Sequence, residues 1–424
     1  MNNSDNSAQN ATSAQKSDAG SGTFYRPRRG FPVGIILLAL LYIAAILAVA
    51  PVLFGWFSPI SAKTMTVREG ECGTWDVVAH MQTDSWPGHD AGIVAISAND
   101  VWATGTNDTA YYSWQPLLYH WDGTSWTRIS LEKPISGEDS LQVHDIVATS
   151  TNDVWVVGNT MNSTYISRPF ALHWDGAQWE ATLKFPGLGD NSGLYSAVAI
   201  SPDDVWAMSD SSHISHWDGS QWSSVSPSYA LDRAGLRLWE VIGLGRDTVW
   251  TVKADGLQSG PTLNIPWAGE ISDRLLRMGD QAYSYAPSAI SALRHDDIWA
   301  VGNYKVNDYN LQGGIVHWDG KTWKMVPSLF VGGYGELHDI KAISPSDVWA
   351  VGEERGRALV LHWDGAKWER VPGPEIIDIQ RLRGIAVAGQ NEIWVVGNAM
   401  RSCEDCYVGH LMTARFTRTP CNQP

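Results

Sequence analysis

Tryptophan recurs through this chain of 424 residues at a nearly fixed interval. A phrase of the type Asp-Val-Trp-Ala-Val-Gly occurs seven times, with 44 to 53 residues separating successive tryptophans. These tryptophans are Trp102, Trp155, Trp206, Trp250, Trp299, Trp349 and Trp394. Self-similarity at such a period is the signature of a repeat architecture, so the chain is predicted to consist of copies of one structural unit.

A second phrase, His-Trp-Asp-Gly-x-x-Trp, follows the first in five units, at residues 120–126, 173–179, 216–222, 317–323 and 362–368. In the sixth unit, four short runs rich in β-branched and aromatic residues alternate with turn-forming residues; the runs are 340–343, 348–351, 359–362 and 368–371. Each unit is therefore predicted to be a four-stranded antiparallel meander. Four strands per period of 40 to 50 residues are typical of propeller blades. The prediction is an all-β, seven-bladed β-propeller.

These phrases resemble those of bacterial β-propeller repeat proteins of the Asp-box, kelch and WD-repeat-like group, where Asp-Gly-x-x-Trp turns recur between the outer strands. The resemblance covers about residues 72–421 and implies the fold. It leaves function open, because the group includes hydrolases, oxidases, lectin-like binders and scaffolds. The fourth unit departs most, since a stretch around Pro266–Gly269 replaces the Trp-Asp-Gly turn. Only the inner strands of that blade are predicted.

The seventh unit lacks its outer strand, and a matching strand stands at the other end of the chain. Residues 73–78, Gly-Thr-Trp-Asp-Val-Val, have the pattern of an outer strand but precede the first unit. We expect this N-terminal strand to close the seventh blade and cover an open sheet edge. Cys72 and Cys421 flank the two strands concerned, which favours a closing disulfide, with Cys403 and Cys406 as a second pair. Four cysteines allow three pairings, and a redox or metal motif at Cys403–Cys406 is the competing interpretation.

The segment 31–57 holds no charged residue and is long enough to span a bilayer as one transmembrane helix. Three arginines precede it at 26, 28 and 29, so the positive-inside rule predicts a cytoplasmic N-terminus and a propeller outside the membrane. Residues 1–30 are then a disordered cytoplasmic tail, 58–71 a linker and 72–424 the propeller. A signal peptide cleaved after 48–50 is the alternative.

The net charge of the chain limits which classes of binding partner are expected. The whole chain carries −15, and residues 1–30 contribute +2, so the remainder carries −17. Nucleic acid is excluded as a partner, because its phosphates would be repelled. The repeated Trp, His and turn Asp residues are expected to be structural, since a residue that recurs in every blade does the same packing in each.

Residues that differ between blades are better candidates for a binding site. Counting back from each repeated Trp to the start of the first strand places one residue per blade at the mouth of the central channel. With their neighbours, the predicted mouth residues are His144, Asp145, Tyr195, Trp239, Glu240, His338, Asp339 and Arg383. Imidazole, aromatic, carboxylate and guanidinium groups around a concavity suit a small polar ligand or a peptide. Simple solvation of these residues is the plainer interpretation.

Aromatic residues in the loops between second and third strands form a second candidate surface. They are Tyr111, Tyr112, Trp114, Tyr165, Tyr304 and Tyr309, interleaved with asparagines that suit sugars or peptides. Alternatively, some of these rings cap the blade edges.

We therefore expect a membrane-anchored, extracytoplasmic module that binds or scaffolds an envelope protein or a glycan. The alternative is a sialidase-like glycoside hydrolase with its site at the channel mouth, for which the arginines at 233, 237, 274, 277, 381 and 383 are candidates. No catalytic pair can be identified from spacing, and no nucleophile elbow or phosphate loop is present. No cofactor and no metal are predicted.

Overall fold

The computed structural model describes residues 73–82, 86–110, 113–131, 140–209, 213–225, 237–243, 249–254, 270–271, 276–278, 281–283, 285–307, 310–326, 335–374, 379–403 and 406–419. Every regular element in these ranges is a β-strand, which confirms the all-β class. The predicted tail 1–30, transmembrane helix 31–57 and linker 58–71 lie outside the described residues. Among the residues described, none belongs to a helix long and apolar enough to cross a membrane.

Four strands in sequential order make up each of the first three sheets. The first contains β2 (Trp86–Ser97), β3 (Asp100–Ala110), β4 (Ser113–Trp121) and β5 (Trp126–Arg128). The second contains β6 (Ser140–Ser150), β7 (Asp153–Met161), β8 (Ser167–Trp174) and β9 (Trp179–Thr182). The third contains β10 (Leu194–Ser201), β11 (Asp204–Ser209), β12 (Ile214–Trp217) and β13 (Trp222–Val225). All neighbouring strands are antiparallel, as predicted.

The fourth unit departs from the antiparallel pattern. Its strands β14 (Arg237–Gly243) and β15 (Val249–Ala254) are antiparallel, but β16 (Glu270–Ile271) pairs with β15 in parallel. The two inner strands predicted for this unit are therefore confirmed, whereas the parallel strand β16 departs from the pattern of the other units. The physical reason is visible in the sequence, where the Trp-Asp-Gly turn that reverses the chain is missing. A short hairpin of β17 (Leu276–Met278) and β18 (Gln281–Tyr283) follows.

The next two units return to the regular pattern. One contains β19 (Tyr285–Arg294), β20 (Asp297–Asn307), β21 (Asn310–Trp318) and β22 (Trp323–Val326). The other contains β23 (Gly335–Ser344), β24 (Asp347–Glu354), β25 (Arg357–Trp363) and β26 (Trp368–Val371). A single parallel pair, Gln312 with Gly335, joins β21 to β23.

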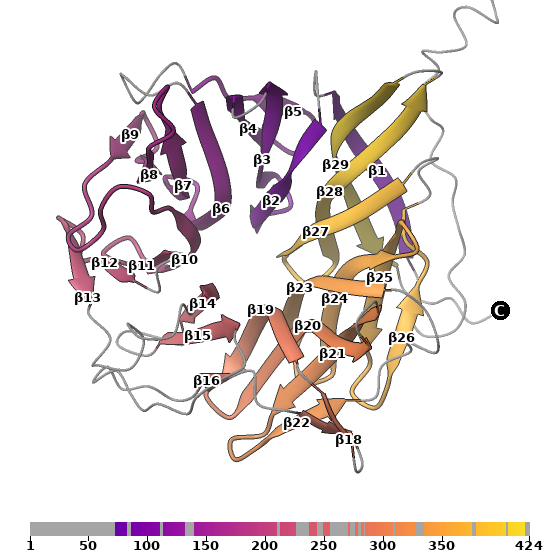
Figure 1. The fold of residues 1–424 in the computed structure, drawn as a ribbon. Coiled ribbons are helices and arrows are strands. Elements are labelled where there is room, and N and C mark those ends of the chain that lie inside the picture. Colours follow the sequence, from indigo (N-terminus) through magenta and orange to yellow (C-terminus); the bar gives the residue numbers. More distant parts are fainter. Residues whose placement is uncertain are drawn as a thin grey trace, which may run out of the picture. The chain divides into compact units, whose positions relative to one another are not determined.

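The last sheet combines the two ends of the described chain. Its order is β1 (Gly73–Gln82), β29 (Cys406–Arg418), β28 (Glu392–Cys403) and β27 (Ile379–Ala388), and Figure 1 shows the indigo β1 beside the yellow β29. Trp75 pairs with Phe416, its ring lies 5.2 Å from that of Phe416, and its Nε1 donates to the Pro372 carbonyl at 2.7 Å. The predicted outer strand is confirmed.

The cysteines cannot be judged in the same way. Cys403 and Cys406 are backbone partners in the hairpin between β28 and β29, but their side chains lie outside the described part. Cys72 and Cys421 lie wholly outside it. Both disulfides stay predictions.

The first strand of each unit contacts the first strand of the next. These contacts run from β2 to β6, β10, β14, β19, β23 and β27, and β27 contacts β2 again. The inner strands of the described chain thus form a closed cycle, with the other strands of each unit outside them.

The repeated tryptophans pack one sheet against the next. Trp155 is 1% exposed, and its ring lies 5.3 Å from Trp217 and 5.5 Å from Trp222 of the following sheet. The same arrangement joins Trp102 to Trp174 and Trp179, Trp299 to Trp363 and Trp368, and Trp394 to Trp121 and Trp126. The structural role predicted for these residues is confirmed.

The repeated histidines belong to the same framework. In the second sheet, the carboxylate of Asp153 accepts bonds from Trp155 Nε1 at 3.0 Å and contacts His173 Nε2 at 2.7 Å, while the imidazole stacks on the indole. His120, His216, His317 and His362 make the equivalent contact with Asp100, Asp204, Asp297 and Asp347. These histidines therefore have the structural role predicted for them, in five units.

A backbone irregularity explains the glycine of the repeated phrase. In the second sheet a β-bulge at residue 144 of β6 brings the Gln142 carbonyl against Gly158, where a Cβ atom would lie 2.0 Å from that oxygen. Gly352 and Gly397 meet the carbonyls of Glu336 and Arg381 in the same way. The bulge and the glycine are thus two parts of one repeated feature.

Candidate functional site

Six units share a backbone irregularity. In the first strand of each, one residue at an equivalent position is left out of the ladder to the second strand. These residues are His144, Tyr195, Trp239, Ser288, His338 and Arg383. A bulge places two residues opposite one and redirects a side chain, and such bulges are enriched next to functional sites. The prediction that these residues begin their strands is wrong, because the strands start further upstream. The prediction that they occupy equivalent places is confirmed by the register.

The bulged residues of the second and third sheets contact each other. The imidazole of His144 stacks on the phenol ring of Tyr195, with ring centroids 4.2 Å apart. His144 Nε2 also lies 2.6 Å from Asn159 Oδ1 in the adjacent strand β7. Both rings are half-buried, so each keeps part of its surface open to a ligand.

A cationic cluster forms where β23 and β27 meet. Arg383 Nη1 lies 3.3 Å from Nδ1 of His338, and Arg381 forms a 2.6 Å ion pair with Glu353. Burial and then the charges of Arg383 and Arg381 lower the pKa of His338 to about 3. His338 is therefore neutral at physiological pH, and the positive charge here belongs to the two arginines. Glu336 lies 4.0 Å from the imidazole.

The carboxylates that follow the two bulged histidines connect neighbouring sheets. Asp145 accepts the N–H groups of Ile146 at 2.7 Å and of Ala197 in β10 at 2.9 Å. Asp339 accepts those of Ile340 at 2.7 Å and Ile385 in β27 at 2.8 Å. These bonds engage both oxygens of each carboxylate, so the aspartates hold neighbouring inner strands together.

The same two carboxylates are hard to ionise. Removal from bulk water raises the pKa of Asp145 to about 6, although its hydrogen bonds oppose the change. Removal from water also raises the pKa of Asp339, to about 7, and the negative charge of Asp145 adds to this effect. This electrostatic effect of Asp145 on Asp339 could not be predicted from the sequence, because the two residues lie in different units.

The remaining predicted residues are only partly placed. Trp239 and Glu240 lie on β14 and Tyr304 on β20, with side chains outside the described part, and Tyr111, Tyr112 and Tyr309 are outside it altogether. Trp114 lies on β4 and pairs with Asp108 of β3.

Tyr165 is 64% exposed in the turn after β7, at a φ of 62° that is rare for an aromatic residue. Its turn is braced by Asn162 Oδ1, which accepts the N–H groups of Thr164 and Ile166.

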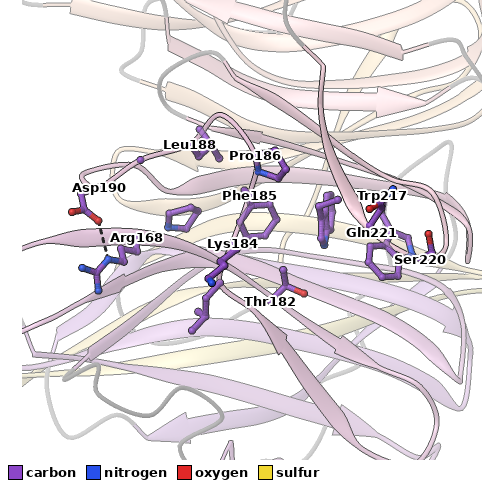
Figure 2. Close-up of a pocket in the computed structure, with 14 residues that line it drawn as sticks. Arg168, Thr182, Lys184, Phe185, Pro186, Leu188, Asp190, Trp217, Ser220 and Gln221 are labelled. Carbon is purple, nitrogen blue, oxygen red and sulfur yellow. Dashed lines mark hydrogen bonds and ion pairs between the residues drawn. The ribbon is translucent and has the colours of Figure 1, made fainter.

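Sequence reasoning missed a groove between the second and third sheets. It measures about 900 Å³ and lies between the segment 182–190 and the turn from β12 to β13. Figure 2 shows Phe185 in its middle, with the Arg168–Asp190 ion pair at one end and Trp217 at the other. The run Leu183-Lys184-Phe185, which lies outside the repeated phrases, was the available signal. In the described ranges, no group of His, Cys, Asp and Glu side chains could hold a metal ion.

Neither a protein-family model nor a curated protein matches the chain. Solved structures do match it. The WD40 repeats of RRP9 align with a TM-score of 0.52 at 6% identity, over 84% of this chain and 100% of that chain. YCF48 from Cyanidioschyzon merolae aligns with a TM-score of 0.47 at 16% identity, over 81% and 98%. The SapL1 lectin in complex with alpha methyl fucoside gives 0.39 at 12%, over 77% and 97%. At these identities the likeness concerns the fold alone, which is a β-propeller of the WD40 type.

Proposed function

We propose that this protein is a binding module, a seven-bladed propeller that holds a partner protein at its channel mouth. One observation carries the proposal: the framework residues repeat from sheet to sheet, whereas the bulged positions hold different residue types, His144 and His338 in two sheets, Tyr195 in another and Arg383 in the last. A framework needs the same residue in every blade. Unlike side chains, redirected by the same backbone irregularity, are what a specific ligand requires.

The chemistry of the mouth indicates what it binds. The His144–Tyr195 stack offers flat, half-buried ring surface, and Arg383, beside His338, offers a positive charge. Aromatic and arginine side chains are the residues that most often anchor protein partners. A segment that presents an apolar or planar group beside a carboxylate fits this arrangement.

The described chain enters the propeller at one end of the last sheet. Gly73, the first residue of β1, pairs with Arg418, whose N–H donates to the Asn391 carbonyl in the turn between β27 and β28. The entry point is therefore at the end of the sheets that carries these turns, and the mouth residues precede the turns along the first strands. We include the predicted membrane anchor 31–57 and an extracytoplasmic propeller in the proposal, which makes an envelope protein the natural partner.

The alternative hydrolase function lacks support at the mouth. Asp145 and Asp339 have the raised pKa values that a general acid needs, but backbone N–H groups occupy both oxygens of each. Arg381 is already paired with Glu353. Of the other candidate arginines, Arg237 and Arg277 have side chains outside the described part, and those at 233 and 274 are wholly outside it.

The proposal is tested by binding of the full-length protein to solubilised envelope proteins and, in parallel, to a glycan array. We expect a stoichiometric protein partner whose affinity falls at least tenfold in the double variant His144→Ala, His338→Ala. Binding to glycans that is lost on the same substitutions would replace the protein partner with a sugar. Unchanged affinity in the double variant would exclude the mouth as the binding surface.

A further inference from the structure

The hairpin between β24 and β25 contains an arginine where this type of turn normally has none. Its two central residues are Arg355, with a φ of 52°, and Gly356, with a φ of 71°. Positive φ at both central positions is the geometry of a type I′ turn, in which Asn-Gly, Asp-Gly and Gly-Gly predominate. A long side chain is disfavoured in the left-handed region, and residues held there cluster at functional sites. An arginine at this position therefore indicates a function that compensates for the unfavourable backbone conformation.

A pocket next to the turn supplies a reason for the arginine. It measures about 460 Å³ and is lined by Glu354, Arg355, Arg357, Ala358 and Arg370. Three of its five residues are arginines that come from the turn, from β25 and from the outer strand β26.

The charge of this pocket is opposite to that of the domain. Glu354 is the single acidic residue of its lining, and its carboxylate is paired with Arg370 at 2.6 Å. The hydrogen bond and charge of Arg370 lower the pKa of Glu354, so this carboxylate is ionised and holds Arg370 in place. Arg355 and Arg357 are exposed, and within the described part of the chain neither makes an ion pair. The pocket lining therefore carries a net charge of two positive units, whereas the chain beyond residue 30 carries −17.

We propose that this pocket of the sixth unit binds a phosphate-type oxyanion. Guanidinium groups form paired hydrogen bonds with the oxygens of phosphate and carboxylate groups. The lining holds three guanidinium groups, and Glu354 pairs with only one of them, so an anion with at least three oxygens matches the pocket better than a carboxylate with two. The site is separate from the proposed mouth, so it does not depend on the function proposed above.

The strained turn makes a discriminating variant possible. Replacing Arg355 with Asn removes one charge and introduces a residue that favours this turn. We expect Arg355→Asn to raise the melting temperature while it weakens oxyanion binding at least tenfold. A residue that served only the fold would not show opposite effects on stability and binding. Arg357→Gln should weaken binding without raising stability.

The probe is pyrophosphate, titrated into the full-length protein by calorimetry at constant ionic strength, with citrate as a carboxylate probe. Arg294→Gln is the matched control, since it removes an exposed arginine from another unit. We expect pyrophosphate to bind the wild type and the control equally, within twofold, and more tightly than citrate.

A second experiment uses vesicles that contain phosphatidic acid. Vesicle binding that depends on the same arginines assigns the anion to a lipid headgroup. The absence of vesicle binding assigns it to a soluble or protein-linked phosphate.

Two results would overturn the proposal. One is the absence of pyrophosphate binding to the wild type at millimolar concentration. The other is an equal loss of binding in Arg294→Gln, which would reduce the effect to diffuse surface charge.

Discussion

The imidazole of His144 lies almost parallel to the phenol ring of Tyr195, at an interplanar angle of 22° and a centroid distance of 4.2 Å. The two residues come from neighbouring inner strands, and each is the residue that its own bulge leaves out of the backbone ladder. A contact between two irregular positions joins the second and third sheets at the mouth. The stacking contact between His144 and Tyr195 thereby fixes the relative position of these two residues of the proposed site.

This stack should contribute measurable coupling to the stability of the domain. In a double-mutant cycle with His144→Ala and Tyr195→Ala, we expect a coupling energy of about 0.5 to 1.5 kcal/mol, as for other paired rings. Denaturant unfolding of the wild type, the two single variants and the double variant measures it. Additive effects would show that the rings only happen to be adjacent.

The glycine opposite the bulge should not tolerate a side chain. Gly158→Ala places a Cβ atom 2.0 Å from the Gln142 carbonyl oxygen, so the strand must shift or the bulge must move. We expect a loss of about 2 to 4 kcal/mol in the free energy of unfolding, comparable to other strained or overpacked substitutions. Gly189→Ala is the matched control, because nothing lies within 4 Å of the added atom. Equal stability of the two variants would contradict the steric account.

The buried carboxylates should give the stability an unusual pH dependence. Asp145 has a folded-state pKa of about 6, above its ordinary value, so its contribution is fully present at low pH and is lost as the pH rises through about 6. The variant Asp145→Asn does not titrate there. Its stability relative to the wild type should therefore increase between pH 5 and pH 7, and Asp339→Asn should show the same sign at slightly higher pH. Chemical unfolding at a series of pH values measures the difference, and a decrease over that range would refute the assignment.

The N-terminal strand should protect the last sheet. Trp75→Ala removes the ring against Phe416 and the bond to the Pro372 carbonyl, and we expect a loss of about 2 to 4 kcal/mol in stability. Hydrogen exchange should accelerate most in β29, which β1 covers, and less in β8 of the second sheet. The exposed Tyr165→Ala is the control. Uniform acceleration across all sheets would show that β1 has no local role.

The repeated residues made the framework readable from the sequence. A fixed period revealed the units, alternating apolar runs revealed their strands, and the missing outer strand of the last unit revealed the place of β1. In that last sheet, Arg415 stands opposite Trp394 as His362 stands opposite Trp349. The equivalence of Arg415 and His362 could not be recognised from the sequence, because the two positions hold different residue types.

The site was less predictable, for reasons that lie in the backbone. The bulges could not be seen, since a residue omitted from a ladder leaves no mark in an apolar pattern. The equivalent positions were nevertheless found in six units, because the bulge falls at the same distance from the repeated Trp in each of them; in the first sheet, Ala91 at that distance is paired with Gly105. The roles of Asp145 and Asp339 depend on backbone donors in the next unit, which no spacing rule reveals. The parallel strand β16 and the groove around Phe185 arise where the repeated phrases fail.

The central claim is that the unlike bulged residues at the mouth bind the partner. Its most direct test is the dissociation constant of the full-length protein for its isolated partner, compared with that of Tyr195→Ala, Arg383→Ala. We predict at least a tenfold weaker affinity for this double variant, and no more than a twofold change for Arg294→Gln, which lies in an exposed pair with Asp296. Equal affinities for all three proteins would contradict the account.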